Sequence, residues 1–112
     1  MITAFRGDGQ RPAYLALTAD SFGRPIQLAV VTEDMGRFNL TGYIVEIAVR
    51  FVKESRPAFT KSVTVVDAVN GVVEFTPDCR DFPRPTGLYY GRLVLKKEGV
   101  NIETREFPIV LY

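Results

Sequence analysis

The feature that most constrains the fold is a period of two over residues 43–53, in which apolar residues line one side and the charged residues Glu46 and Arg50 fall on the other. Val45, Ile47 and Val49 fall on one side of this run, and Glu46 falls on the other. Successive side chains of an extended strand point to opposite faces, so the pattern predicts a strand with one buried face. The β-branched residues in the run oppose a helix, because they lose side-chain freedom there.

Shorter runs of the same kind recur along the chain, separated by glycine, proline, asparagine and aspartate. We expect further strands at residues 13–18, 26–32, 63–67, 72–76, 88–97 and 102–112. Asn70-Gly71 predicts a hairpin with a type I′ turn, and Pro108 predicts that its strand lies at an edge or carries a bulge. About seven strands with regular turns predict an all-β fold, an immunoglobulin-like antiparallel β-sandwich.

The chain has 112 residues, which suits one domain. Residues 1–11 contain Gly7, Asp8 and Gly9 and little periodicity, so we expect a flexible N-terminal arm followed by a sandwich over residues 12–112. The proline-rich segment 76–86 is expected to hold one helical turn that crosses between the two sheets.

Histidine is absent and Cys79 is the single cysteine. These two facts remove Ser-His-Asp and Cys-His catalysis, an intrachain disulfide and the common zinc sites. The carboxylates form no cluster with metal-ligand spacing. We therefore expect no catalytic residue, no metal site and no cofactor, and we expect Cys79 to be a partly buried apolar residue. An enzyme on a β-sandwich is the least favoured alternative.

The formal net charge is +1, so bulk electrostatics favour neither nucleic acid nor an anionic membrane as a partner. The N-terminus lacks a basic start followed by an apolar run, and the apolar runs are too short to span a bilayer. We expect a soluble chain that is synthesised in a cytoplasm and does not insert into a membrane.

The segment 80–85, Arg-Asp-Phe-Pro-Arg-Pro, mixes arginine and phenylalanine in a loop stiffened by proline. Arginine and aromatic residues are enriched at protein interfaces, so Arg80, Phe82 and Arg84 are interface candidates. The alternative is an ordinary connection between sheets whose Phe82 fills the core. Two consecutive tyrosines, at positions 89 and 90, place one ring on each face of their strand, and Tyr90 is the fourth interface candidate.

Several weak motifs occur in a fixed order. They are Pro-Ile-Gln-Leu at residues 25–28, Leu-Thr-Gly at 40–42, Asn-Gly-Val-Val-Glu-Phe at 70–75, Gly-Leu-Tyr-Tyr at 87–90 and Glu-Thr-Arg-Glu-Phe-Pro-Ile at 103–109. In this order the sequence resembles the N-terminal immunoglobulin-like domain of phage baseplate upper proteins and related tail or fibre proteins. Gly42, Asn70, Gly71 and Gly87 match the motifs as residues that set backbone geometry.

The resemblance implies a non-enzymatic structural protein of a phage virion, synthesised in the host cytoplasm. Such an adaptor docks fibre or receptor-binding components onto the tail baseplate or another part of the particle. The implied partners are other virion proteins of the baseplate, tail, fibre or head, and further copies in a homo-oligomer. The alternative is a sandwich that binds a carbohydrate or host receptor through Tyr90, Phe82 and Arg84.

Overall fold

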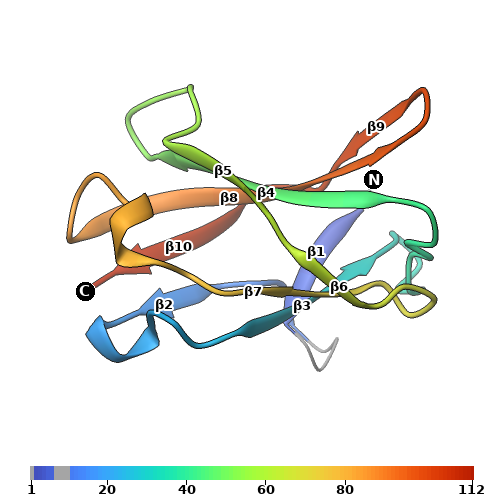
Figure 1. Ribbon diagram of the computed structural model, residues 1–112, viewed down its shortest axis with the longest axis horizontal. Coiled ribbons are helices and arrows are strands. Elements are labelled where there is room, and N and C mark those ends of the chain that lie inside the picture. Colours follow the sequence, from blue (N-terminus) through green and yellow to red (C-terminus); the bar gives the residue numbers. More distant parts are fainter. Residues whose placement is uncertain (1, 7–10) are drawn as a thin grey trace.

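The alternating runs fold into two β-sheets that face each other (Figure 1). The computed structural model describes residues 2–6 and 11–112. In this part of the chain the strands are β1 (Thr3–Arg6), β2 (Leu15–Leu17), β3 (Ile26–Val31), β4 (Ile44–Phe51), β5 (Phe59–Ser62), β6 (Thr64–Asp67), β7 (Val72–Phe75), β8 (Gly87–Lys97), β9 (Val100–Glu103) and β10 (Phe107–Leu111). The all-β prediction is confirmed.

One sheet has the strand order β1-β3-β7-β6, and the other has the order β2-β10-β8-β4-β5 with β9 also paired to β8. Neighbouring strands are antiparallel, apart from β2 and β10, which run parallel. The chain passes from one sheet to the other between β1 and β2, β2 and β3, β3 and β4, β5 and β6, and β7 and β8. These crossings place strands that are close in sequence on opposite layers of the sandwich.

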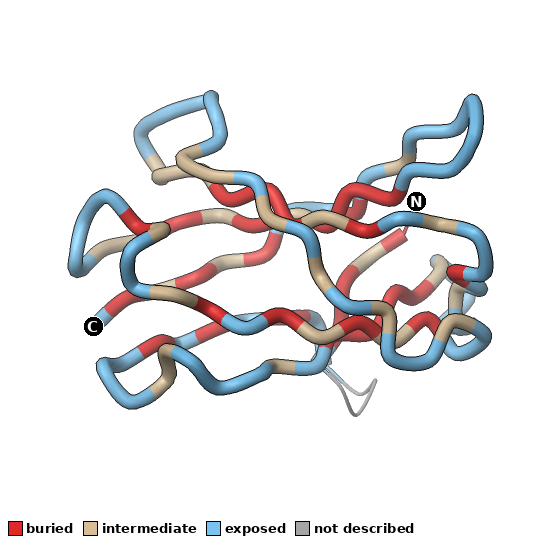
Figure 2. Tube along the Cα trace, in the orientation of Figure 1, coloured by how far each residue is buried: buried red, intermediate tan, exposed pale blue. Residues whose placement is uncertain are grey.

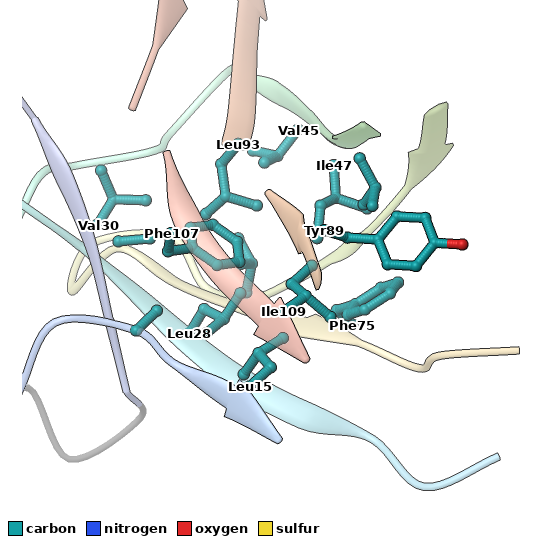
Figure 3. Close-up of a cluster of buried hydrophobic side chains, with 14 of the residues drawn as sticks. Leu15, Leu28, Val30, Val45, Ile47, Phe75, Tyr89, Leu93, Phe107 and Ile109 are labelled. Carbon is teal, nitrogen blue, oxygen red and sulfur yellow. The ribbon is translucent and has the colours of Figure 1, made fainter. Parts of the chain in front are cut away.

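The core lies between the two sheets and is made by one side of each long strand (Figure 3). Val45, Ile47 and Val49 of β4 are buried there, as the alternation predicts. Tyr89 of β8 and Phe75 of β7 are the largest fully buried side chains. Burial of apolar area stabilises the fold by about 25 cal/mol per Å². Figure 2 shows that the turns at both ends of the sandwich are mostly exposed.

The N-terminal arm is the clearest correction. Residues 3–6 are not an arm, because β1 pairs with β3 along its whole length, from Thr3 opposite Val31 to Arg6 opposite Leu28. Ile2 is buried with the main core as well. The expectation was wrong here because four residues are too few to reveal a period-two pattern before the glycines begin. Residues 1 and 7–10 of the expected arm lie outside the described residues, and the Arg11 carbonyl accepts a hydrogen bond from the Arg6 amide.

The described residues form ten strands instead of about seven. β1 and β5 were missed, and the expected strand at 102–112 is divided into β9 and β10. Thr104 bridges the division, since its hydroxyl accepts a hydrogen bond from the Leu93 amide at 3.0 Å and its own amide donates to the Leu93 carbonyl at 2.9 Å. Pro108 pairs with β8, whereas β2 pairs with β10 only from Ile109 onward. Proline has no backbone N–H to donate. Because the β2 pairing begins only at Ile109, Pro108 removes no hydrogen bond between β10 and β2.

The expected hairpin at Asn70-Gly71 joins β6 to β7, but its turn differs from the type I′ prediction. Gly71 has a φ of 70°, whereas Asn70 does not have a positive φ. Asp67 closes the turn instead, since its carboxylate accepts bonds from the Asn70 amide and side chain. A Cβ on Gly71 would lie 2.4 Å from the Phe38 carbonyl oxygen, so glycine is required there. The expected helical turn is confirmed as a 3₁₀ turn, η2 (Cys79–Asp81), whose Cys79 is exposed and not partly buried.

Candidate interaction surface

Phe82 is part of the core and is not an interface residue. Its side chain is 6% exposed. Its ring lies 5.0 Å from that of Phe59, 5.1 Å from that of Tyr89 and 6.0 Å from that of Phe22, measured between centroids. The contacts with Phe59 and Tyr89 are edge-to-face, an arrangement that adds to the stabilisation from burial. The alternative given by the sequence, a connection between sheets whose phenylalanine fills the core, is therefore correct.

Arg84 lies in the exposed loop that precedes β8. Its backbone is fixed by Tyr89, because the Arg84 amide donates to the Tyr89 hydroxyl at 3.0 Å and that hydroxyl donates to the Arg84 carbonyl at 3.2 Å. The Arg84 guanidinium lies 4.7 Å from the centre of the Phe51 ring. This side chain therefore covers the end of the sandwich next to the aromatic core.

Arg80 is exposed in η2, where it binds Asp78 at 2.7 Å. Asp78 caps the turn by accepting a bond from the Arg80 amide at 2.9 Å. The side-chain and backbone hydrogen bonds from Arg80 lower the pKa of Asp78 to about 2. The local role of Arg80 is thus to hold the acid that starts the 3₁₀ turn.

Tyr90 lies on the opposite face of β8 from the buried Tyr89. The Arg50 guanidinium carbon lies 4.9 Å from the centre of the Tyr90 ring. The four predicted interface residues therefore do not form one site. Phe82 is buried, Arg80 and Arg84 lie in the connection between β7 and β8, and Tyr90 lies on the outer face of a sheet.

Uncharged side chains lie on the β10 side of Tyr90, and Arg50 lies on its β4 side. The register places Val110 of β10 between Ala16 of β2 and Leu88 of β8, and it pairs Pro108 with Tyr90. Tyr14 is two residues before Ala16, and Tyr112 is two residues after Val110. Side chains two residues apart on a strand point to the same face, so both tyrosines extend this patch. We call the patch the tyrosine face and define it as Tyr14, Ala16, Leu88, Tyr90, Pro108, Val110 and Tyr112.

The tyrosine face is open to solvent. Tyr14 is 48% exposed and Tyr112 is 67% exposed. Leu88, Tyr90 and Val110 are only partly buried, and none of them belongs to the core. A hydrogen bond between the two terminal rings raises the pKa of the Tyr14 hydroxyl. Tyrosine is enriched at protein interfaces because it combines a rigid apolar ring with a polar end.

The other half of the same outer face carries three ion pairs between strands. Lys96 binds Glu46 at 2.9 Å, Arg92 binds Glu103 at 3.1 Å, and Arg50 binds Glu106 through two bonds of 2.7 and 3.0 Å. We call these six residues the ion-pair half. The guanidinium of Arg50 also donates to the carbonyls of residues 52 and 54. It lowers the pKa of Glu106 below its usual range.

The described residues contain no group of three or more metal-ligating side chains. No helix in this part of the chain has the length and apolar character needed to cross a membrane. No protein-family model and no curated protein matches the chain. The site must therefore be judged on its own chemistry.

Sequence reasoning found Tyr90 but missed its neighbours. The signal was present in the alternation, because Tyr14 and Ala16 alternate with buried leucines of β2, and Pro108 and Val110 alternate with buried residues of β10. This parity predicts that each residue points outward from its own strand. It does not reveal that β2 and β10 are neighbours, which is what joins the residues into one patch.

Proposed function

We propose that this chain is a non-enzymatic, immunoglobulin-like adaptor of a phage virion. It docks fibre or receptor-binding components onto the tail baseplate or another part of the particle, and the tyrosine face is its docking surface. The observation that carries the proposal is this patch of side chains without charge, which includes the exposed Tyr14 and Tyr112 and the partly buried Tyr90. The phage assignment depends on the order of the sequence motifs.

The strand order supports the immunoglobulin-like part of the proposal. Immunoglobulin domains have one sheet of order A-B-E-D and another of order G-F-C, which variable-type domains extend by C′. Here β1-β3-β7-β6 corresponds to the first sheet, and β10-β8-β4-β5 corresponds to the second. The two hydrogen bonds between the Tyr89 hydroxyl and the Arg84 backbone resemble the tyrosine corner of these domains.

The test uses the phage that encodes the chain and a Val110→Glu substitution. A carboxylate at the centre of the tyrosine face leaves the core intact but prevents close apolar contact. We expect the folded variant to be absent from purified particles, as measured by mass spectrometry and by immunogold labelling of wild-type and variant particles.

Val69→Glu is the matched control. Val69 is 65% exposed on the turn between β6 and β7, in the other sheet. This variant should be incorporated normally. The docking proposal is wrong if Val110→Glu is incorporated as well as Val69→Glu, or if the wild-type chain is absent from particles.

A carbohydrate- or host-receptor-binding function is the second candidate, and the exposed rings of Tyr14 and Tyr112 favour it. Its expected site changes, because Phe82 is buried and Arg84 covers the end of the sandwich. A glycan array with the purified chain tests this candidate. Binding that Tyr112→Ala removes would support it, and an array without binding would eliminate the carbohydrate form.

A further inference from the structure

Strand β2 has one paired edge and one free edge. On the paired edge, the Leu17 carbonyl accepts a hydrogen bond from the Tyr112 amide, which follows β10, at 3.0 Å. Successive residues of a strand direct their backbone groups to opposite edges, so the N–H and C=O of Ala16 point away from β10. Because β2 is the last strand of its sheet, these two groups point out of the sheet.

The backbone groups on either side of Ala16 along this free edge are already bonded within the chain. The Arg6 side chain donates to the Tyr14 carbonyl at 3.2 Å, and the Thr18 amide donates to the Ser21 hydroxyl at 3.0 Å. Across residues 2–6 and 11–112, the N–H and C=O of the exposed Ala16 have no hydrogen-bond partner. The free edge therefore has one open position, with a donor and an acceptor, between two closed ones.

A cavity of about 220 Å³ lies at this open position, with Ala16 in its lining. Its apolar wall comes from β2 and the start of β3 and consists of Leu15, Leu17 and Ile26. Its polar lining consists of Arg6, Ser21 and Arg24. Sites for whole small molecules usually have about 300–1,000 Å³, so this smaller cavity suits a single amino-acid residue.

The two arginines of the cavity, Arg6 and Arg24, bind no carboxylate in the part of the chain that the structure describes. By contrast, Arg50, Arg80 and Arg92 each bind one. None of the residues that line the cavity is acidic. A guanidinium has five N–H donors, and Arg6 uses its bond to the Tyr14 carbonyl for one of them. The cavity therefore offers cationic donors beside the open N–H of Ala16, a combination that favours a carboxylate.

The C-terminal residue of a peptide matches this set of groups. In a hydrogen-bonded antiparallel pair, the N–H of each residue binds the C=O of the other. A C-terminal residue opposite Ala16 donates its N–H to the Ala16 carbonyl, and one oxygen of its carboxylate accepts the Ala16 N–H. The second carboxylate oxygen is then left for an arginine. An acidic side chain within a segment has no N–H beside its carboxylate, so it leaves the Ala16 carbonyl without a donor.

We propose that this cavity binds the C-terminal residue of a partner protein through its free carboxylate. The Ala16 N–H and the guanidinium groups of Arg6 and Arg24 hold the carboxylate, and the apolar wall takes an aliphatic terminal side chain. The inference rests on the proposed function for the partner being a docked protein. Ala16 belongs both to the tyrosine face and to the cavity lining, so a partner that covers this face can end in the cavity.

The test is an NMR titration of the purified chain with N-acetyl-leucine, which has the N–H, the aliphatic side chain and the carboxylate of a C-terminal residue. N-acetyl-leucinamide differs from it by the loss of the charged group and is the matched probe. The backbone amide signals of residues 15–17 and the arginine side-chain N–H signals report binding at the cavity. We expect a Kd of about 1 mM for the acid and at least tenfold weaker binding of the amide.

Two variants and one control assign the binding to the cavity. Arg24→Gln removes one charge from the lining and should weaken binding of the acid at least tenfold. Ala16→Pro removes the open N–H without removing a hydrogen bond to β10 and should weaken binding as much. Arg56→Gln, at an exposed arginine between β4 and β5, should bind as the wild-type chain does. Circular dichroism checks that each variant is folded.

The inference is overturned if the acid and the amide bind equally, or if neither gives saturable shifts at about ten times the expected Kd. Two further probes separate other occupants. Tighter binding of N-acetyl-glutamic acid α-amide, whose one carboxylate is on the side chain, would assign the cavity to an internal acidic residue and overturn the C-terminal assignment. The peptide acetyl-Ala-Ala-Leu should bind at least as tightly as N-acetyl-leucine. Binding at least tenfold weaker would show that the cavity takes a free small acid and not a protein.

Failure of this inference can be told apart from failure of the proposed function. Loss of Val110→Glu from particles, together with no binding of N-acetyl-leucine, would keep the docking surface and remove the C-terminal site. Binding of N-acetyl-leucine in the cavity, together with normal incorporation of Val110→Glu, would keep the site and remove the adaptor role of the tyrosine face.

Discussion

The two halves of the outer face on the β2-β10-β8-β4-β5 sheet differ in how their side chains are satisfied within the chain. Strand β8 belongs to both, with Tyr90 in the tyrosine face and Arg92 and Lys96 in the ion-pair half. The ion-pair half satisfies its polar groups inside the chain, and its long side chains cover the buried Ala48 and Val94. The tyrosine face leaves its rings exposed to solvent. The difference teaches that the ion-pair half has its charged groups paired within one chain, whereas the tyrosine face keeps apolar area exposed, which is why we propose it as the docking surface.

Thr104 lies where the two halves meet, between β9 and β10, and its loss should have the largest effect. Thr104→Val removes the hydroxyl that accepts a hydrogen bond from the Leu93 amide. That amide is then buried without a hydrogen-bond partner. We expect the free energy of unfolding to fall by about 2 kcal/mol in urea denaturation. Thr104→Ser keeps the hydroxyl and should recover most of the loss. Equal destabilisation by both substitutions would show that the hydroxyl, which only Thr104→Val removes, contributes no more than the methyl group, which only Thr104→Ser removes.

The next largest effect is expected at Arg50. This residue binds Glu106 in the ion-pair half, and its guanidinium lies over the ring of Tyr90 in the tyrosine face. Arg50→Met keeps the apolar stem but removes the paired bonds to Glu106 and the bonds to two carbonyls. We expect a loss of about 1–1.5 kcal/mol in the free energy of unfolding.

The matched variant for Arg50→Met is Val110→Glu in the tyrosine face. It should lower the free energy of unfolding by up to about 1 kcal/mol, because Val110 is partly buried in a strand that is paired on both sides. A larger loss from Val110→Glu than from Arg50→Met would reverse the comparison between the two halves.

Lowering the pH should reduce the contribution of the Arg50–Glu106 pair to the free energy of unfolding. Arg50 lowers the pKa of Glu106 in the folded chain, so the unfolded chain binds its proton more readily. The resulting stability is present above the unfolded pKa of about 4.3 and is lost as the pH falls through the lower folded pKa. Because the Glu106 side chain is partly exposed, the effect should be a few tenths of a kcal/mol. Denaturation curves of the wild-type chain and of Glu106→Gln between neutral and acid pH measure it, and identical pH dependence would contradict it.

The smallest effect belongs to the hydroxyl of Tyr14. Its pKa is raised chiefly by the hydrogen bond with Tyr112. Tyr112→Phe should move the Tyr14 pKa back toward its ordinary value without changing the fold, as followed by absorbance of the tyrosinate during titration. An unchanged titration curve would show that the two rings are independent in solution. Tyr43→Phe, at the opposite end of the sandwich, is the control.

The sequence predicts the long strands well and the short ones poorly. The alternation in β4 and β8 extends over enough residues to identify a buried face, and Asn70-Gly71 places a hairpin correctly. β1 and β5 have four residues each, too few for a periodic signal. The type I′ turn was wrong because Asp67 offers Asn70 hydrogen bonds that a two-residue turn lacks.

The candidate surface was predicted only at Tyr90, for a topological reason. Its residues come from β2, β8 and β10, and the parallel pairing of β2 with β10 joins Ala16 to Val110 across most of the chain. Alternation indicates the face of a strand but not its neighbours. The prediction for Phe82 left two alternatives because an arginine- and proline-rich loop suits either. Its contacts with Phe59 and Tyr89 decide between them.

The parallel pairing of β2 with β10 also determines how the domain resists mechanical force. β2 lies near the start of the chain and β10 ends it, and the two strands run in the same direction. Tension that pulls the chain ends apart therefore slides these strands along each other and loads their hydrogen bonds together in shear. A zipper-like geometry would instead break one bond after another. Load that passes from β2 to β10 is therefore borne by the bonds of this three-residue pairing together.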